Sequence, residues 1–402
     1  MNTKISEWVS VGHPDRTADY IASRIITEIY KKDGKNAHAA IEIALFDNKV
    51  IIGGEVRTTL PMTSEYWTPI VHEAINKIGY NKEYRNKFTK DDCYIADDYE
   101  VQIYVNQQSP DIAKGTTDKA DTEPGWNDQG TYVGYCSNEL PTNGLSIPHY
   151  IASSFGNYLY QKALKSGHFG IDIKVLVVYK EDEENKKVTN ITVAIPFCND
   201  YFPKDAEPVI TIYKKFWFWK KEQPDCIQKL IPVNLEFLVN GTGVYKRHGS
   251  LGDSGVTGRK LVVNQCGNYA AGGSMIKPIL ASDRLLNQYA RHIAKVICDS
   301  GLSDEATVEL SASIGQTYLE SMKISCPGKD RQFCEKLEQY FLSIPVSPNI
   351  LNSKWKTLER NNYDEAVFNN FFGSTDYTIE PWEEVKTQEK ENLLDFIAKR
   401  KI

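Results

Sequence analysis

The sequence lacks the long apolar runs and the excess of positive charge that mark two broad classes of protein. No stretch approaches the 18 apolar residues of a membrane span, and the N-terminal MNTKISEWVS has no apolar segment typical of a signal peptide. The net charge is −6 at pH 7, whereas sequence-independent binding to nucleic acid or anionic membrane needs a basic face. We therefore expect a soluble, non-secreted, cytoplasmic protein that binds neither nucleic acid nor membrane.

Three common site motifs are also missing. The eight cysteines are scattered with no C-x-x-C, which is typical of reduced cytosolic thiols. The seven histidines form no H-E-x-x-H or H-x₃₋₅-H pair, so a zinc site is not expected. The spacing G-x-x-x-x-G-K-[ST] of a Walker A loop is absent, as is a G-x-G-x-x-G after a strand.

Long helical patterns alternate with pairs of strands along the 402 residues, whose hydrophobic content of 41% can bury a large core. Helices are predicted from Asp15 to the polar run KKDGKN, over 64–79, over 148–165, and from Asp283 to Gly301 with Ser282 as N-cap. Strands are predicted in the hairpin 40–56, over 93–106, 171–179, 188–195 and 261–265, with a loop over 107–130. The pattern recurs about three times, which predicts an α+β chain of three similar units.

The hairpin raises a question of charge. A two-residue turn at Asn48 and Lys49 would place Glu42 directly opposite Glu55 on the neighbouring strand. Two facing carboxylates repel each other, so either this face of the hairpin is exposed to solvent or a cation or amine lies nearby.

Two other stretches suggest a polyanion site. In GHPDR, Pro14 suits the first helical position and Asp15 suits the helix dipole, but His13 and Asp15 at a helix N-terminus could also face an anion. Further along, GDSGVTGRK and GGSMIK place glycines beside Arg and Lys, which is what close approach to a polyphosphate needs. Asp15 and Asp283 each begin a helix, and carboxylates meeting over phosphates are typical Mg²⁺ ligands.

These stretches occur in the order found in one family, and the chain resembles S-adenosylmethionine synthetase along nearly its whole length. The family's GHPDK is similar to GHPDR, its GGE to Gly53-Gly54-Glu55, and its QSPDI is intact from Gln108 to Ile112. NDQGTYVGYCSNE, GDSGVTGRK, ASDR and EPWE are similar to four further family motifs.

The resemblance implies an α+β fold of three similar repeats, each a sheet plus helices, around a pseudo-threefold axis. The repeats would span residues 1–111, 124–241 and 243–386. The resemblance also implies a homodimer with shared active sites, and in the family such dimers often pair into a tetramer. The implied reaction joins L-methionine to C5′ of ATP and displaces triphosphate, which is hydrolysed to phosphate and pyrophosphate before release.

The resemblance also implies a role for each matching residue. His13, Lys174, Arg259 and Lys277 match catalytic residues. The residues that match ATP and triphosphate ligands are His13, Asp172, Lys174, Tyr245, Asp253, Arg259, Lys260 and Lys277. Those that match methionine ligands are Glu55, Gln108 and Asp253. Asp15 and Asp283 match Mg²⁺ ligands, and Glu42 matches a K⁺ ligand.

Ala281 departs from the family pattern, because it replaces a lysine that contacts triphosphate. A lost charge-assisted hydrogen bond costs about 1.5–3 kcal/mol unless another group replaces it. The departure leaves two alternatives to an active synthetase. One is a non-catalytic, nucleotide-binding regulatory relative, and the other is a triphosphate hydrolase that does not need methionine.

Overall fold

The computed structural model describes residues 2–107, 125–165, 168–182, 185–198, 207–264, 266–267, 269, 272–368 and 370–399. The strands are β1 Asn2–Val9, β2 His38–Phe46, β3 Lys49–Arg57, β4 Glu100–Gln107, β5 Gly130–Ser137, β6 Lys174–Glu181, β7 Lys186–Ala194, β8 Glu236–Val239, β9 Gly255–Val256, β10 Glu305–Ala312 and β11 Ser321–Ser325. The helices are α1 Pro14–Asp33, α2 Ser64–Ile78, α4 Ile147–Lys165, α5 Glu207–Lys221, α6 Asp225–Lys229, α7 Leu261–Asn264, α8 Ser282–Asp299, α9 Arg331–Leu342, α10 Pro348–Trp355, α11 Glu365–Phe368 and α12 Thr387–Lys399.

The described strands form three sheets, in the orders β4-β3-β2-β9, β1-β6-β7-β8 and β11-β10-β5. Each sheet takes a strand from a distant part of the chain. β9 pairs with β2, β1 pairs with β6, and β5 pairs with β10, all antiparallel. The mixed α+β class is therefore confirmed, and the sheets tie the N-terminal, central and C-terminal parts of the chain together.

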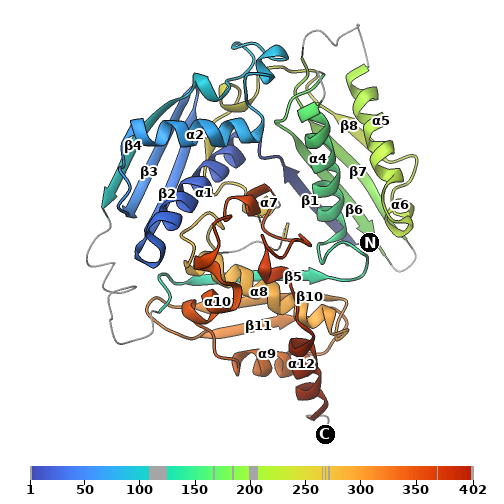
Figure 1. Cartoon of the computed structure of the whole chain (residues 1–402). Coiled ribbons are helices and arrows are strands. Elements are labelled where there is room, and N and C mark those ends of the chain that lie inside the picture. The colour runs from blue at the N-terminus through green and yellow to red at the C-terminus, as the bar shows by residue number, and fades with distance from the viewer. Residues whose placement is uncertain are drawn as a thin grey trace.

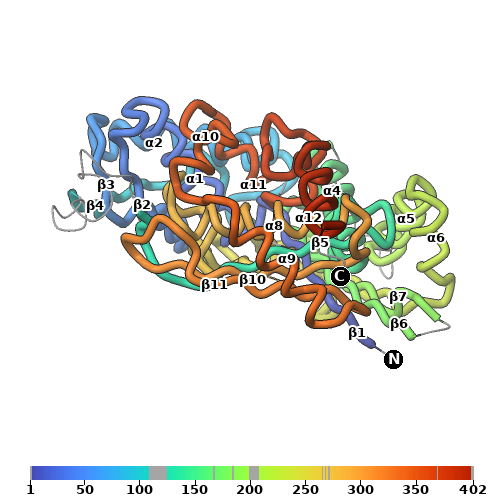
Figure 2. The backbone as a smooth tube through the Cα atoms, turned by 90° about the horizontal axis from the view of Figure 1, so that it is seen from below, coloured from blue at the N-terminus to red at the C-terminus, as the bar shows by residue number. Residues whose placement is uncertain are grey.

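Helices pack on the sheets from within the molecule (Figure 1). α1 contacts β2, α4 contacts β1 and β6, and α8 contacts β5 and β10. Seen from below, α2 and α10 lie along one side of the molecule and β10 and β11 lie along the other (Figure 2). Large apolar side chains remain exposed on strands of two sheets, including Leu176 on β6 and Tyr104 on β4.

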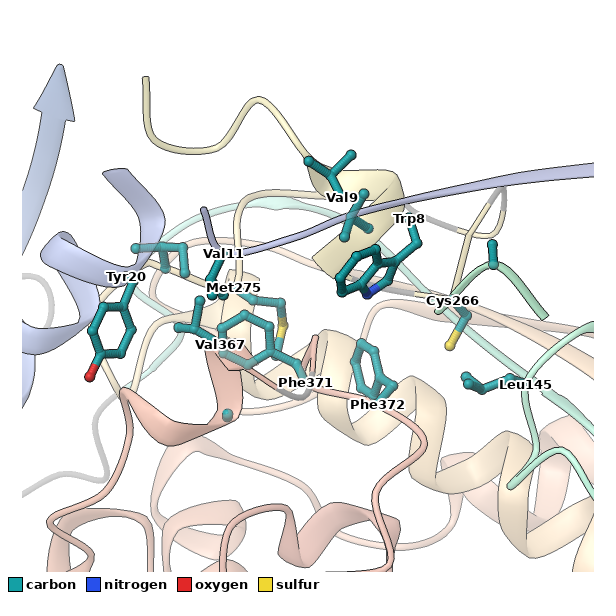
Figure 3. Packing of buried hydrophobic residues seen from close by; sticks show 14 of the residues in the cluster. Trp8, Val9, Val11, Tyr20, Leu145, Cys266, Met275, Val367, Phe371 and Phe372 are labelled. Atoms are coloured by element: carbon teal, nitrogen blue, oxygen red, sulfur yellow. The ribbon is translucent and has the colours of Figure 1, made fainter. Parts of the chain in front are cut away.

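A buried core joins the start of α1 to the C-terminal part of the chain. In Figure 3, Val11, Met275, Val367 and Phe371 gather in one group, with Trp8 and Phe372 beside it. These side chains come from three separate segments, so the core fixes the end of β1 and the turn before α1 against residues 275 and 367–372. This packing positions the candidate site described below.

The helices predicted at the start of the chain, over 64–79 and over 148–165 are confirmed as α1, α2 and α4. The helix predicted from Asp283 is α8, although its N-cap is Ala281 rather than Ser282. The strands predicted over 171–179 and 188–195 are β6 and β7 with shifted ends. Most of the predicted loop, residues 108–124, lies outside the described residues.

The hairpin is confirmed, but the predicted register is wrong. Phe46 pairs with Lys49, so the turn residues are Asp47 and Asn48, and Asp47 takes the positive φ of 54° that a tight turn needs. Glu42 therefore faces Gly53, while Glu55 faces Ala40. The two carboxylates share a face as diagonal neighbours, because a shift of two positions keeps a side chain on the same face.

Two other predicted strands need correction. Residues 261–264 form the short helix α7, because the Val263 and Asn264 N–H groups both donate back to the Lys260 carbonyl. The Asn264 side chain also donates to Asp19, which holds this turn against α1. The strand predicted over 93–106 begins only at Glu100, after the 3₁₀ turn Ala96–Asp98.

Candidate functional site

The beginning of α1 places His13 and Asp15 side by side in a buried position. His13 is the N-cap residue, and the Asp15 backbone N–H donates to its Nδ1 at 3.2 Å. Because Nδ1 accepts this bond, the proton of the neutral ring is on Nε2. Nε2 is buried without a hydrogen-bond partner among the described residues and lies 3.9 Å from Asp253 Oδ2. A buried donor of this kind can be completed by an acceptor from water or from a ligand.

Cationic side chains converge on His13 from three segments of the chain. Burial, and then the charges of Lys174, Lys260, Arg16 and Arg259, lower the pKa of His13 to about 2. The imidazole is therefore neutral near pH 7, and the positive charge around it suits an anion.

The cations differ in how firmly they are already paired. Lys260 Nζ donates to Asp15 Oδ2 at 2.6 Å, and Arg259 Nη1 lies 3.5 Å from Asp15 Oδ1. The side chain of Lys174, at the start of β6, makes no hydrogen bond or close ion pair with another described residue. Arg16 is fully buried and donates to Asp19 and to the Val367 carbonyl, so it anchors the helix instead of facing a ligand.

The segment 255–260 links the start of α1 to strand β2. The Val256 N–H donates to Asp15 Oδ1 at 2.9 Å, and the Gly258 N–H donates to Asp19 Oδ1 at 2.9 Å. On the other side, the Thr257 hydroxyl donates to Glu42. The basic, glycine-containing sequence is thus held in place by carboxylates on both neighbouring elements.

Asp172 lies just before Lys174 and extends the site toward residues 245–249. The Gly249 N–H donates to Asp172 Oδ2 at 3.0 Å. Burial raises the pKa of Asp172 to about 6, against the opposing effects of that hydrogen bond and of Lys174. Burial raises the pKa of the Tyr245 hydroxyl, and the charge of the nearby Asp172 raises that pKa further.

Lys277, Glu42 and Asp283 form a second group of charges. Lys277 Nζ donates to Glu42 Oε1 at 2.9 Å and also interacts with Asp283 and Asp128. Burial, and the nearby Asp128, raise the pKa of Asp283 although Lys277 opposes the shift. The backbone approaches closely here, since a Cβ on Gly273 would lie 1.8 Å from Asp283 Oδ2.

Glu55 lies on the same sheet face as Glu42, but its partner is His38. The His38 Nε2 and Glu55 Oε1 atoms are 3.5 Å apart. Gln108, the third residue predicted to bind methionine, lies outside the described residues. Asp253 is predominantly exposed, and its carboxylate faces His13.

No role was expected from the sequence for Asp128, Thr257 or His38. Asp128 lies in NDQGTYVGYCSNE and Thr257 in GDSGVTGRK, two stretches similar to family motifs, whereas nothing in the sequence singled out His38. The structure also shows that Arg284 does not replace the lysine missing at Ala281. Arg284 is buried, and its guanidinium packs over the rings of Tyr363 and Phe371.

The carboxylate donors fit Mg²⁺. Mg²⁺ is usually held by one or two carboxylates together with substrate phosphates, and Asp283 with Asp128 offers neighbouring carboxylates whose repulsion a cation would relieve. Both oxygens of Glu42 accept bonds from Thr257 and Lys277, just as those of Asp15 accept from Val256 and Lys260, so a cation at either carboxylate would share it with these donors. Among the described residues, no three Asp, Glu, His or Cys side chains form a complete metal cage.

Taken together, the fold and the site define an α+β protein with a buried, neutral histidine surrounded by cationic side chains. Comparison with known proteins gives the family. The family model "S-adenosylmethionine synthetase, N-terminal domain" matches residues 2–110, and "S-adenosylmethionine synthetase, C-terminal domain" matches residues 248–384.

Whole-chain relatives agree with the family models. An S-adenosylmethionine synthase of Mesoplasma florum is 32% identical over 96% of this chain and 98% of its own length. An S-adenosylmethionine synthase of Acholeplasma laidlawii is 31% identical over 94% of this chain and 96% of its own length. The solved structure of an unusual S-adenosylmethionine synthetase from Campylobacter jejuni superposes with a TM-score of 0.82 at 27% identity, covering 98% of this chain and all of that one. The chain belongs to the S-adenosylmethionine synthetase family.

Proposed function

We propose that this chain joins ATP and L-methionine to form S-adenosylmethionine. The methionine sulfur attacks C5′ of ATP, the C5′–O bond breaks, and the triphosphate leaves intact. Bound triphosphate is then hydrolysed to phosphate and pyrophosphate. The observation that carries this proposal is the buried Nε2–H of His13, which lacks a partner while Lys174, Arg259 and Lys260 surround it.

His13 has the protonation state that a leaving oxygen needs. Its neutral ring holds a proton on Nε2, so it donates a hydrogen bond to the oxygen on which negative charge develops. Lys174, Arg259, Lys260 and Lys277 stabilise the rest of the triphosphate. Since Asp15 already orients Arg259 and Lys260, and Glu42 orients Lys277, little reorganisation of these three groups is needed during the reaction.

Asp15 and Asp283 are the proposed Mg²⁺ ligands, and Asp128 is a neighbouring carboxylate. Mg²⁺ would neutralise phosphate charge in the bound substrate. Glu42 is the proposed K⁺ ligand, and K⁺ would share its carboxylate with Lys277 and Thr257. Tyr245 keeps an aromatic face for stacking on adenine.

Glu55, Gln108 and Asp253 are the proposed methionine ligands. The carboxylates of Glu55 and Asp253 are both accessible, so either can pair with the ammonium group of an amino acid. Asp253 reaches toward His13, which supports a methionine position next to the C5′ carbon.

The open sheet faces support a homodimer with shared sites, which could associate further into a tetramer. Glu42 and Glu55 lie on one face of their sheet, and Lys174 shares a face of its own sheet with the exposed Leu176. A second copy covering these faces would bring site residues from two chains together. We further propose three repeats over 1–111, 124–241 and 243–386 about a pseudo-threefold axis, in keeping with the three sheets.

None of the helices in the described residues combines the length and apolar character that crossing a lipid bilayer requires. All eight cysteines are free thiols. The free thiols support a cytoplasmic location, which we propose for this chain.

Product analysis tests the proposed reaction. Purified protein is incubated with ATP and Mg²⁺, with and without L-methionine, and nucleosides and phosphates are separated by chromatography. We expect S-adenosylmethionine, phosphate and pyrophosphate in equal amounts, with triphosphate cleavage that depends on methionine. Cleavage without methionine would indicate a triphosphate hydrolase. ATP binding without any product would indicate a regulatory relative.

A further inference from the structure

A second cavity lies away from the proposed ATP site, among α8, α9, α10 and α12. Its volume is about 310 Å³, within the range of small-molecule sites. Its walls are mainly apolar and include Ile293, Val296, Phe341, Ile350 and Leu351. Ile293 is ten residues along α8 from Asp283, a separation of about 15 Å by helical rise.

One end of this cavity is polar and carries three ionisable side chains. His292 Nδ1 lies 2.9 Å from the Trp382 carbonyl, to which it donates, and His292 Nε2 lies 2.9 Å from Glu389 Oε1. Lys354 donates to Glu389 and lies 3.0 Å from His292 Nε2. The imidazole itself is buried, whereas Lys354 and Glu389 retain some contact with solvent.

The unused hydrogen-bonding capacity at this end consists of donors. Both oxygens of Glu389 already accept bonds, Oε1 from Lys354 and Oε2 from the Lys386 N–H at 3.0 Å. Lys354 has three N–H groups and uses two toward Glu389 and His292. Asn392, an exposed residue of the cavity lining, accepts from Gln388 through Oδ1, and within the described part of the chain its amide N–H groups have no protein acceptor.

We propose that this cavity binds a small carboxylate with an apolar body. The carboxylate accepts hydrogen bonds from Lys354 and Asn392, and the apolar body fills the space between α8, α9 and α10. Charge and shape favour this occupant, because the apolar walls suit an apolar body, the third N–H of Lys354 suits an anionic acceptor, and a cation would meet Lys354. Glu389 and Asn392 belong to α12, which begins after residue 384, where the C-terminal family model ends.

The first test uses octanoate as the probe and calorimetric titration of the whole protein without ATP or methionine. We expect one octanoate per chain, with affinity rising about fourfold for each methylene from butyrate to octanoate, the factor that corresponds to about 0.8 kcal/mol. Octanol and octylammonium should bind at least tenfold more weakly. No binding of octanoate, or equal binding of octanol, would overturn the proposal.

Variants locate the binding site. Lys354→Gln should weaken octanoate at least tenfold and leave octanol unchanged, whereas Lys399→Gln removes the same charge from exposed α12 surface and should have no effect. Ile350→Trp fills the cavity from a partly exposed position and should abolish binding of octanoate without lowering S-adenosylmethionine formation or Tm. Unchanged octanoate affinity in folded Ile350→Trp would place the ligand elsewhere and overturn the proposal.

Discussion

Asp172 is a residue whose ionisation should be visible in ATP binding. Burial raises its pKa from 3.8 to about 6, so the side chain is neutral below about pH 6 and negative above it. A new negative charge beside Lys174 opposes a polyanion, so we expect the KM for ATP to rise as pH increases through 6. Steady-state kinetics between pH 5 and 8 measures this step.

Asp172→Asn is the control for that pH profile, because it keeps an oxygen for the Gly249 N–H and removes the titration. ATP titrates in the same range, so the difference between the two profiles is the informative quantity. Identical profiles would contradict the assignment. The raised pKa of Asp172 also means that the free energy of unfolding falls as pH rises from 3.8 to about 6. In this range the folded state keeps a proton on Asp172 that the unfolded chain has released.

At the scale of elements, the β2–β3 hairpin depends on Gly54. Gly54 has φ of +126°, and a Cβ there would lie 2.0 Å from the Ala40 carbonyl oxygen. We expect Gly54→Ala to lower the free energy of unfolding by about 1–3 kcal/mol, the cost of a strained backbone position. Gly53→Ala is the matched control, since its nearest neighbour would lie 3.9 Å away. Equal urea midpoints for the two variants would argue against this register.

α8 is anchored by a buried ion pair. Arg291 Nε and Nη2 each donate at 2.8 Å to the carboxylate of Glu383 in the turn Pro381–Glu383, and both side chains are inaccessible to solvent. Glu383→Ala leaves the guanidinium buried and uncompensated, so urea unfolding should show a loss of about 3–5 kcal/mol. Breaking the exposed pair Lys323–Glu309 with Lys323→Ala should cost less than about 1 kcal/mol. Similar losses in both variants would contradict this explanation.

The elements with strong local signals were predictable from the sequence. α1, α2, α4 and α8 have apolar periodicity and clear ends, and they formed where expected. The register of β2 and β3 could not be predicted, because one residue in the turn decides it and both Asp47 and Asn48 suit such turns. α7 was missed because tertiary bonds from Asn264 to α1 outweigh the strand propensity of LVV.

The site was predictable through family motifs more than through local pattern. His13, Asp15, Arg259 and Lys260 do meet, as expected. The pairing of Lys277 with Glu42 and the proximity of Asp128 to Asp283 join residues far apart in the chain, which only the fold reveals. The buried position of Arg284 was equally hidden, since its partners Tyr363 and Phe371 lie in the C-terminal part of the chain.

At the scale of the whole molecule, the proposed dimer makes a distinct prediction. Leu176 is 37% exposed on the sheet that carries Lys174, and Leu394 on α12 is 40% exposed. Leu176→Asp should convert the dimer to a monomer in sedimentation velocity and reduce S-adenosylmethionine formation at least tenfold. Leu394→Asp should change neither property. A Leu176→Asp protein of unchanged mass and activity would exclude this face as the interface.

The central claim concerns the Nε2–H of His13 and is tested most directly by single-turnover formation of S-adenosylmethionine. The wild-type protein is compared with His13→Ala and with the control His72→Ala, whose ring contacts the Tyr99 carbonyl outside the site. Loss of one donor to a developing negative charge should slow the His13→Ala reaction by about 10²–10³, with His72→Ala unaffected. A folded His13→Ala protein that forms product within tenfold of the wild-type rate would contradict the account.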